Sequence, residues 1–99
     1  MKVMISQPMR GKEEEIIIKE RESLIKEITA LGYEYVDTIV ATKAPEDMDT
    51  AIYYLSKSIE WIGKVDAVIF MKGWEKARGC KIEHAVAVEY GKQVFYCNE

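Results

Sequence analysis

The chain has 99 residues, of which 48% are hydrophobic and 31% charged, with 14 Lys and Arg against 17 Asp and Glu. This composition is typical of one globular domain spanning residues 1–99 and excludes a two-domain enzyme. The net charge of −3, with basic residues interspersed among acidic ones, argues against binding of a nucleic-acid polymer. No apolar stretch is long enough for a membrane span or a signal peptide, so we expect a cytoplasmic protein that does not bind membranes. Cys80 and Cys97 lack metal-ligand spacing, so we expect reduced thiols and no metal site.

The first half of the chain alternates between strand and helix patterns. An apolar run at 3–5 predicts a strand that opens into a loop at 8–11. Apolar residues then recur at helical spacing over 12–31, with acidic residues in the first turn and a glycine after the last. β-branched and aromatic residues over 33–41 predict a second strand, and a polar loop over 42–49 follows it.

The second half repeats this alternation twice. A helical stripe of Ala51, Leu55, Ile59 and Ile62 precedes residues 66–71, a nearly continuous apolar run typical of a central parallel strand. A loop at 72–79, a helix at 80–90 and a last strand at 93–97 complete the pattern. Since parallel strands are joined by right-handed crossovers, the order predicts a small α/β fold. We expect a doubly wound, four-stranded parallel sheet of order 2-1-3-4 with helices on both faces.

Ligands of such sheets bind beyond the carboxyl ends of the strands, here between the loops at 6–11 and 72–79. Neither loop carries a GxGxxG or P-loop motif, so we expect no dinucleotide or nucleoside triphosphate site. Glu83 lies about one turn into the third predicted helix, where the helix dipole favours the ionised form that a nucleophile or general base requires. The alternative is an ordinary first-turn glutamate without catalytic function.

Three segments resemble the nucleoside 2-deoxyribosyltransferase superfamily, and the resemblance spans nearly the whole chain. They are MISQPMRG at 4–11, VDAVIF at 65–70 and GCKIEHAVAVEYGK at 79–92. Within the superfamily the chain is most similar to the small phage and bacterial branch. The resemblance implies a flavodoxin-like fold and a catalytic cleft shared between two copies. It also implies cleavage or transfer of the N-glycosidic bond of a nucleoside or a nucleoside 5′-monophosphate, with no cofactor.

The resemblance assigns the catalytic roles to two carboxyl groups. Glu83 would attack the anomeric carbon as the base leaves, and Asp66 would handle the proton of the base. A retaining glycosyl transfer needs such a pair. Asp66 also fits a simpler role, as the polar start of a buried strand, far from the site.

One departure from the superfamily pattern leaves other functions open. An acidic residue normally stands six positions before the nucleophile and holds the sugar hydroxyls, and this chain has Ala77 there. Its absence favours a catalytically silent nucleoside- or nucleotide-binding module, or a structural interaction protein of the same fold.

Eight further residues are candidates for substrate binding because they lie in the two loops. Ser6 and Gln7 can hydrogen-bond a sugar or base, Arg10 can bind a 5′-phosphate, and Trp74 can stack on a base. The set is Ser6, Gln7, Met9, Arg10, Gly11, Trp74, Arg78 and Gly79. The alternatives are that Pro8 and Gly11 simply shape the turn after the first strand and that Arg78 is an exposed arginine. His84 is expected at the surface or in an interface.

The short chain predicts self-association, because a domain of this size buries only about 60–65% of its unfolded surface. Tyr53, Tyr54 and Trp61 lie on the second predicted helix. We therefore expect a homodimer or a higher homo-oligomer with this helix in the interface.

Overall fold

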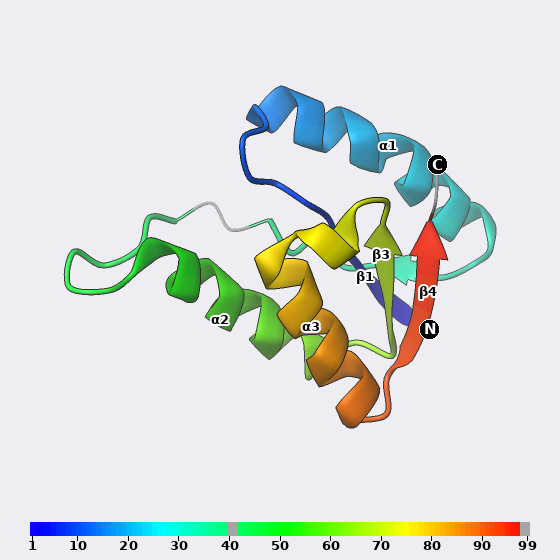
Figure 1. The fold of residues 1–99 in the computed structure, drawn as a ribbon. Helices are drawn as coiled ribbons and strands as arrows, with labels where there is room; N and C mark the ends of the chain where they lie inside the picture. The colour runs from blue at the N-terminus through cyan, green and yellow to red at the C-terminus, as the bar shows by residue number, and fades with distance from the viewer. Residues whose placement is uncertain (40–41, 98–99) are drawn as a thin grey trace.

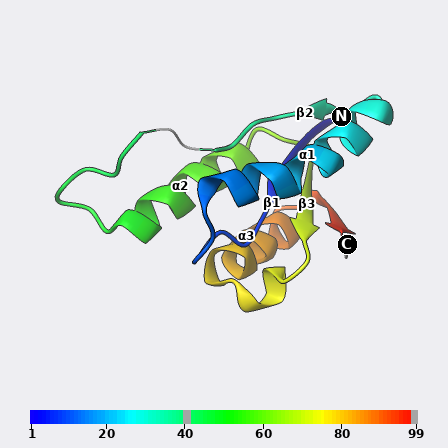
Figure 2. The same cartoon turned by 90° about the horizontal axis from the view of Figure 1, so that it is seen from above.

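A computed structural model describes residues 1–39 and 42–97 of the chain. In order, the elements are β1 (Lys2–Ser6), α1 (Glu14–Ala30), β2 (Glu34–Tyr35), α2 (Thr50–Ile62), β3 (Ala67–Met71), the 3₁₀ helix η1 (Trp74–Lys76), α3 (Arg78–Glu89) and β4 (Gln93–Cys97). The strands form one parallel sheet of order β2-β1-β3-β4, which confirms the predicted order. Helix α1 packs on one face, and α2 and α3 pack on the other (Figures 1 and 2). The small, doubly wound α/β fold is therefore confirmed.

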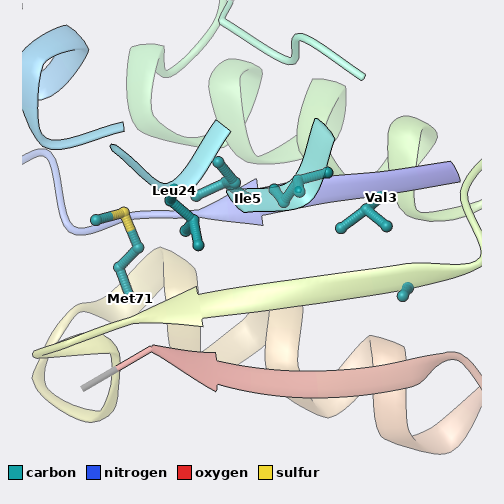
Figure 3. Close-up of a cluster of buried hydrophobic side chains, with 6 residues drawn as sticks. Val3, Ile5, Leu24 and Met71 are labelled. Atoms are coloured by element: carbon teal, nitrogen blue, oxygen red, sulfur yellow. The ribbon is translucent and has the colours of Figure 1, made fainter. Parts of the chain in front are cut away.

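Alternating side chains of the strands supply two hydrophobic cores, one on each face of the sheet. On the α1 face, Val3 and Ile5 of β1 pack with Leu24 of α1 and Met71 of β3 (Figure 3). The core on the other face contains Met4, Ile62, Val65, Val68, Phe70 and Ala87. Because β1 and β3 are buried on both faces, they are the apolar centre of the molecule.

The second strand is much shorter than predicted. Of the expected residues 33–41, only Glu34–Tyr35 form strand β2. The Asp37 side chain accepts a hydrogen bond from Ile39 N at 3.0 Å, a local bond that competes with strand pairing for the backbone donor. The last two positions of the predicted strand lie outside the described residues. A local side-chain bond at Asp37 therefore replaces the strand pairing that composition favoured.

The helices begin and end within two residues of their predicted positions. The helix predicted at 12–31 spans Glu14–Ala30, and the one predicted at 80–90 spans Arg78–Glu89. The loop predicted at 72–79 is consequently shorter, and it contains η1. Among the described residues, no helix has the length and apolar content needed to cross a membrane.

Helix α2 is most deeply covered by the rest of the chain near its end. The Asp49 side chain caps its first turn by accepting from Ile52 N at 3.0 Å. Ile62, in the last turn, is the buried residue of α2. The first turns of α2 extend away from the sheet (Figures 1 and 2) and leave Ile52 57% exposed.

We expect Ile28→Ala to destabilise the fold by about 2–5 kcal/mol, because Ile28 is 2% exposed in the core under α1. The matched control is Ile18→Ala in the same helix, where the side chain is 42% exposed. This control should change the free energy of unfolding by less than about 0.5 kcal/mol. Urea unfolding of both variants measures the difference, and equal effects would contradict the assignment of this core.

Candidate functional site

The inner strands β1 and β3 end side by side at one edge of the sheet. The outer strands extend the sheet from them in opposite directions. Ser6 of β1 pairs with Phe70 of β3. Strand β2 lies beyond β1, and β4 lies beyond β3. Parallel α/β sheets bind ligands at this kind of switch point. Helix α3 begins at the same edge, so its first turns face the ends of the inner strands.

Glu83 is a buried carboxylic acid in the second turn of α3. The residue is 8% exposed. Burial raises the pKa of Glu83 from 4.5 to about 7, against the opposing effects of the Ser6 hydroxyl and the Arg21 charge. A Cβ atom placed on Gly79 would lie 3.7 Å from Glu83 Oε2, so the glycine leaves this side of the carboxyl group without a side chain. The group therefore changes between acid and carboxylate near neutral pH.

The expectation that the start of α3 favours the ionised form of Glu83 is wrong. Glu83 is the sixth residue of a helix that begins at Arg78. The helix dipole acts mainly within the first turn, which Glu83 has already left. Loss of water around the side chain has the larger effect, and the pKa rises.

Ser6 presents a buried hydroxyl beside Glu83. Ser6 is 2% exposed, and within the described part of the chain its Oγ has no partner that meets hydrogen-bond geometry. The hydroxyl nevertheless lies close enough to Glu83 and to Cys80 to lower the pKa of both groups against the effect of burial. Since buried polar groups nearly always have a partner, Ser6 remains a candidate for contacting a bound substrate.

Gln7, predicted to bind substrate, is already used within the fold. It is 5% exposed, and its Oε1 accepts a hydrogen bond from Arg21 Nε. Its Nε2 donates to Ile17 O at 3.0 Å and to Glu20 Oε1 at 3.1 Å. The Gln7 amide is therefore satisfied by helix α1 and is not turned toward Glu83.

Arg21 is a residue of the site that the sequence analysis missed. It is 2% exposed, and besides its bond to Gln7 it donates from Nη1 to Tyr35 Oη at 3.1 Å and from Nη2 to Ile5 O at 3.4 Å. In the sequence, Arg21 stands on the apolar stripe of α1, three residues before the buried Leu24. A charge on an otherwise apolar stripe is the signal that would have identified it.

The structure does not bring Asp66 to Glu83. Strand β3 begins at Ala67, so Asp66 lies at the amino end of the sheet. There it is exposed, and its Oδ2 accepts a hydrogen bond from Lys2 N at 2.7 Å. The five residues of β3 separate Asp66 from the carboxyl edge by about 16 Å. Within one copy of the chain, Asp66 has the simpler role of a polar strand start.

Trp74 lies in an aromatic cluster at the edge of the site. Its indole ring stacks on the ring of His84, with centroids 4.2 Å apart and planes inclined by 21°. The ring centroids of Phe70 and Trp74 are 5.4 Å apart, and His84 Nε2 is 2.6 Å from Tyr96 Oη. His84, expected at the surface, is half-buried in this cluster. One face of Trp74 is thus already covered by protein, and the cluster joins η1 to α3 and β4.

The remaining loop candidates are exposed at the same edge. Gly11 has a φ of +77°, and Lys12 N donates to Met9 O at 3.1 Å, so the glycine serves a tight turn. Arg10 and Arg78 are exposed, and neither forms a salt bridge among residues 1–39 and 42–97. Both arginines are therefore available to an anion at the carboxyl edge.

Two cavities adjoin the sheet. The one at the carboxyl edge has a volume of about 320 Å³ and is lined by Gln7, Pro8, Lys12, Glu20, Met71 and Lys72. The other, of about 490 Å³, is an apolar groove between α1 and β4 that includes Leu24, Ile28, Leu31, Ile69, Phe95 and Cys97. In the described residues, no three His, Cys, Asp or Glu side chains are grouped as metal ligands.

The fold is shared with a solved enzyme structure. The chain superposes on the Clostridium botulinum CMP N-glycosidase BcmB with a TM-score of 0.63 and 20% sequence identity, over 97% of this chain and 67% of that one. The likeness supports the small α/β fold expected from the sequence, whereas the nucleoside 2-deoxyribosyltransferase superfamily and its phage and bacterial branch remain predictions. No curated protein matches the chain.

A family match covers almost all of the sequence. Residues 1–96 match DUF4406, a domain of unknown function. The matched range includes the described strands and helices except for Cys97, the last residue of β4. The chain therefore belongs to the DUF4406 family.

Proposed function

We propose that the chain cleaves or transfers the N-glycosidic bond of a nucleoside or a nucleoside 5′-monophosphate, with Glu83 as the nucleophile. The observation that carries the proposal is the buried Glu83 carboxyl group at the switch point, beside a Ser6 hydroxyl that has no hydrogen-bond partner within residues 1–39 and 42–97. The fold shared with a CMP N-glycosidase supports this choice of bond. Buried carboxyl groups with a raised pKa in such positions are typical of functional sites.

The reaction requires Glu83 in its ionised form. A carboxylate oxygen attacks the anomeric carbon, the bond from that carbon to the base nitrogen breaks, and the base leaves with the bonding electrons and takes up a proton. Water or a second base then attacks the same carbon and releases the Glu83 carboxylate. Because the pKa of Glu83 is about 7, the rate of base release is expected to rise with pH until about pH 7.

Two arginines at the carboxyl edge favour a substrate with a 5′-phosphate. Arg10 follows β1 and Arg78 begins α3, and both are exposed. A guanidinium group binds phosphate through two parallel charged hydrogen bonds. Neither residue makes a salt bridge within the described residues that would compete for it.

Within one copy of the chain, none of the described residues is identified as the donor of the proton that the departing base takes up. No second carboxylate affects the ionisation of Glu83 among the described residues, and Asp66 lies at the other edge of the sheet. We therefore propose that the active unit is a homodimer whose cleft is shared. Helix α2 is the proposed interface, because Ile52, Tyr54 and Ile59 on it are each more than a third exposed.

A second candidate function is binding of a nucleoside or nucleotide without catalysis. Ala77 favours it, because this position offers no acid to hold the sugar hydroxyls. The two functions differ in whether free base is released.

We expect Glu83→Gln to abolish release of free base from deoxyribonucleosides and their 5′-monophosphates while the fold and ligand binding persist. The amide has the shape of the acid but cannot form the glycosyl ester. Glu89→Gln is the matched control, an exposed glutamate at the end of the same helix, and it should retain the full rate. Chromatography of the released base measures the rate.

Base release by Glu83→Gln at the rate of the unaltered protein would overturn the catalytic role. If the unaltered protein releases no base from any tested compound but binds one in calorimetry, the silent binding module becomes the function.

The stability of the protein should depend on pH through Glu83. Because the pKa is raised on folding, protonated Glu83 favours the folded state, and this contribution is complete below pH 4.5 and lost as the pH rises through about 7. The rise from 4.5 to about 7 is equivalent to about 3 kcal/mol. Relative to the unaltered protein, Glu83→Gln should therefore gain up to about 3 kcal/mol between pH 5 and pH 8. Urea unfolding at both values tests this, and a pH-independent difference would contradict it.

Light scattering at tens of micromolar should give the mass of a dimer or a higher oligomer. Ile52→Glu should shift the mass to that of the monomer, because it places a charge on the proposed interface. The control is Ile18→Glu on α1, which is also exposed and should leave the mass unchanged. A monomeric mass for the unaltered protein would exclude the shared cleft.

A further inference from the structure

We propose that Arg21 is a positioning residue for the nucleophile. Its guanidinium group is fixed on the α1 side of the end of β1, and its charge stabilises the Glu83 carboxylate on the α3 side. The proposal rests on the proposed role of Glu83 and adds a residue from a different helix to the site. Arg21 does not contact the reacting atoms and acts through Glu83.

The guanidinium group is held rigidly by three elements. Its Nε donates to Gln7 Oε1 just beyond β1, its Nη1 to Tyr35 Oη of β2 at 3.1 Å, and its Nη2 to Ile5 O of β1 at 3.4 Å. At 2% exposure it has almost no contact with solvent. Arg21 is therefore a fixed positive charge rather than a mobile side chain.

This charge has no carboxylate partner of its own. The salt bridges among residues 1–39 and 42–97 are Lys12–Glu20 and Lys57–Glu60. A buried charge is costly unless another charge compensates it. Arg21 is thus satisfied by hydrogen bonds to neutral groups, and its charge is left to act on a group elsewhere in the molecule.

The alternation of side chains at the end of β1 identifies that group. Ser6 and Gln7 are consecutive, so their side chains point to opposite faces of the sheet. Gln7 binds Arg21 on the α1 side, and the Ser6 hydroxyl lies beside Glu83 on the α3 side. Arg21 and Glu83 thus flank one strand end, and the Arg21 charge lowers the pKa of Glu83 against the effect of burial.

The other titratable groups around Glu83 do not replace this charge. On α3, the neutral thiol of Cys80 lies near Glu83, and burial raises the pKa of that thiol. His84 follows on the helix but is stacked on Trp74. On the α1 side, Glu20 is paired with Lys12 at 3.1 Å.

Arg21 also has a structural role that the test must separate from the electrostatic one. Val36 N donates to Val3 O at 2.9 Å, as a strand partner would, and the next carbonyl of β1 on that side is Ile5 O. Strand β2 has ended there, and Arg21 Nη2 takes the vacant donor position. Loss of Arg21 should therefore lower stability whether or not it affects Glu83.

Three variants separate charge from structure. Arg21→Gln removes the positive charge and keeps a hydrogen-bond donor. Arg21→Lys keeps the charge and loses the planar guanidinium group. Tyr35→Phe removes one hydrogen bond to Arg21, and the charge of Arg21 remains. The readouts are the pH profile of base release and a carbon-13 titration of the Glu83 carboxyl, whose signal is identified by its loss in Glu83→Gln. Circular dichroism and urea unfolding verify the fold of each variant.

Arg21→Gln should shift both titrations upward by about half a pH unit, which lowers base release at pH 6 about threefold. Arg21→Lys and Tyr35→Phe should titrate near the unaltered protein despite any loss of stability. A folded Arg21→Gln with an unchanged Glu83 titration would overturn the proposal. If Arg21→Gln does not fold, an upward shift of half a unit or more in Arg21→Lys would overturn it instead. Because the carbon-13 titration needs no turnover, it decides the role of Arg21 even if no base is released.

Discussion

The parallel pairing of β1 with β3 fixes the geometry on which the site depends. Val3 faces Ala67 and Ser6 faces Phe70, and both strands are buried on both faces. Because side chains alternate along a strand, a slip of one residue would turn Ser6 toward α1 and its neighbour toward α3. The apolar residues on either face forbid that slip. The position of each polar group at the carboxyl edge is thus a consequence of core packing several residues earlier in the strands.

The site departs from ordinary packing rules at three adjacent side chains. Ser6 has a buried hydroxyl without a partner in the part of the chain that the structure describes, Glu83 is a buried acid, and Arg21 is a buried cation. Burial of each polar group alone would lower the free energy of unfolding, and a hydrophobic side chain of similar size would pack there without that loss. The three lie at one strand end, whereas the other buried side chains of the domain are almost all apolar. Such a group of unfavourably buried polar side chains is typical of functional sites, which often lower the stability of the fold.

Local sequence patterns predicted the order of the elements and of the strands, because periodicity and the crossover rule need only the chain itself. They also selected Glu83 as a candidate, and its catalytic role stays a prediction. They failed where a distant side chain decides the outcome. Strand β2 was predicted too long because the bond from Ile39 N to Asp37 is not visible in composition. Gln7 was predicted to bind substrate because its bonds to α1 are not visible in the sequence, and Arg21 was not among the predicted site residues. Burial of Glu83 likewise depends on contacts that no spacing rule contains.

The uneven covering of the sheet has a consequence for its dynamics. On one face of the four-stranded sheet the single helix α1 provides the cover, and the groove between α1 and β4 leaves Phe95 41% exposed. Strand β4 also pairs on one side only, with β3. Amide hydrogens of β1 and β3 should consequently exchange with solvent only on global unfolding, whereas those of β4 can exchange through local opening. The strand end that holds Ser6 thus lies in the most slowly exchanging part of the sheet, and the edge near Tyr96 can open without disturbing it.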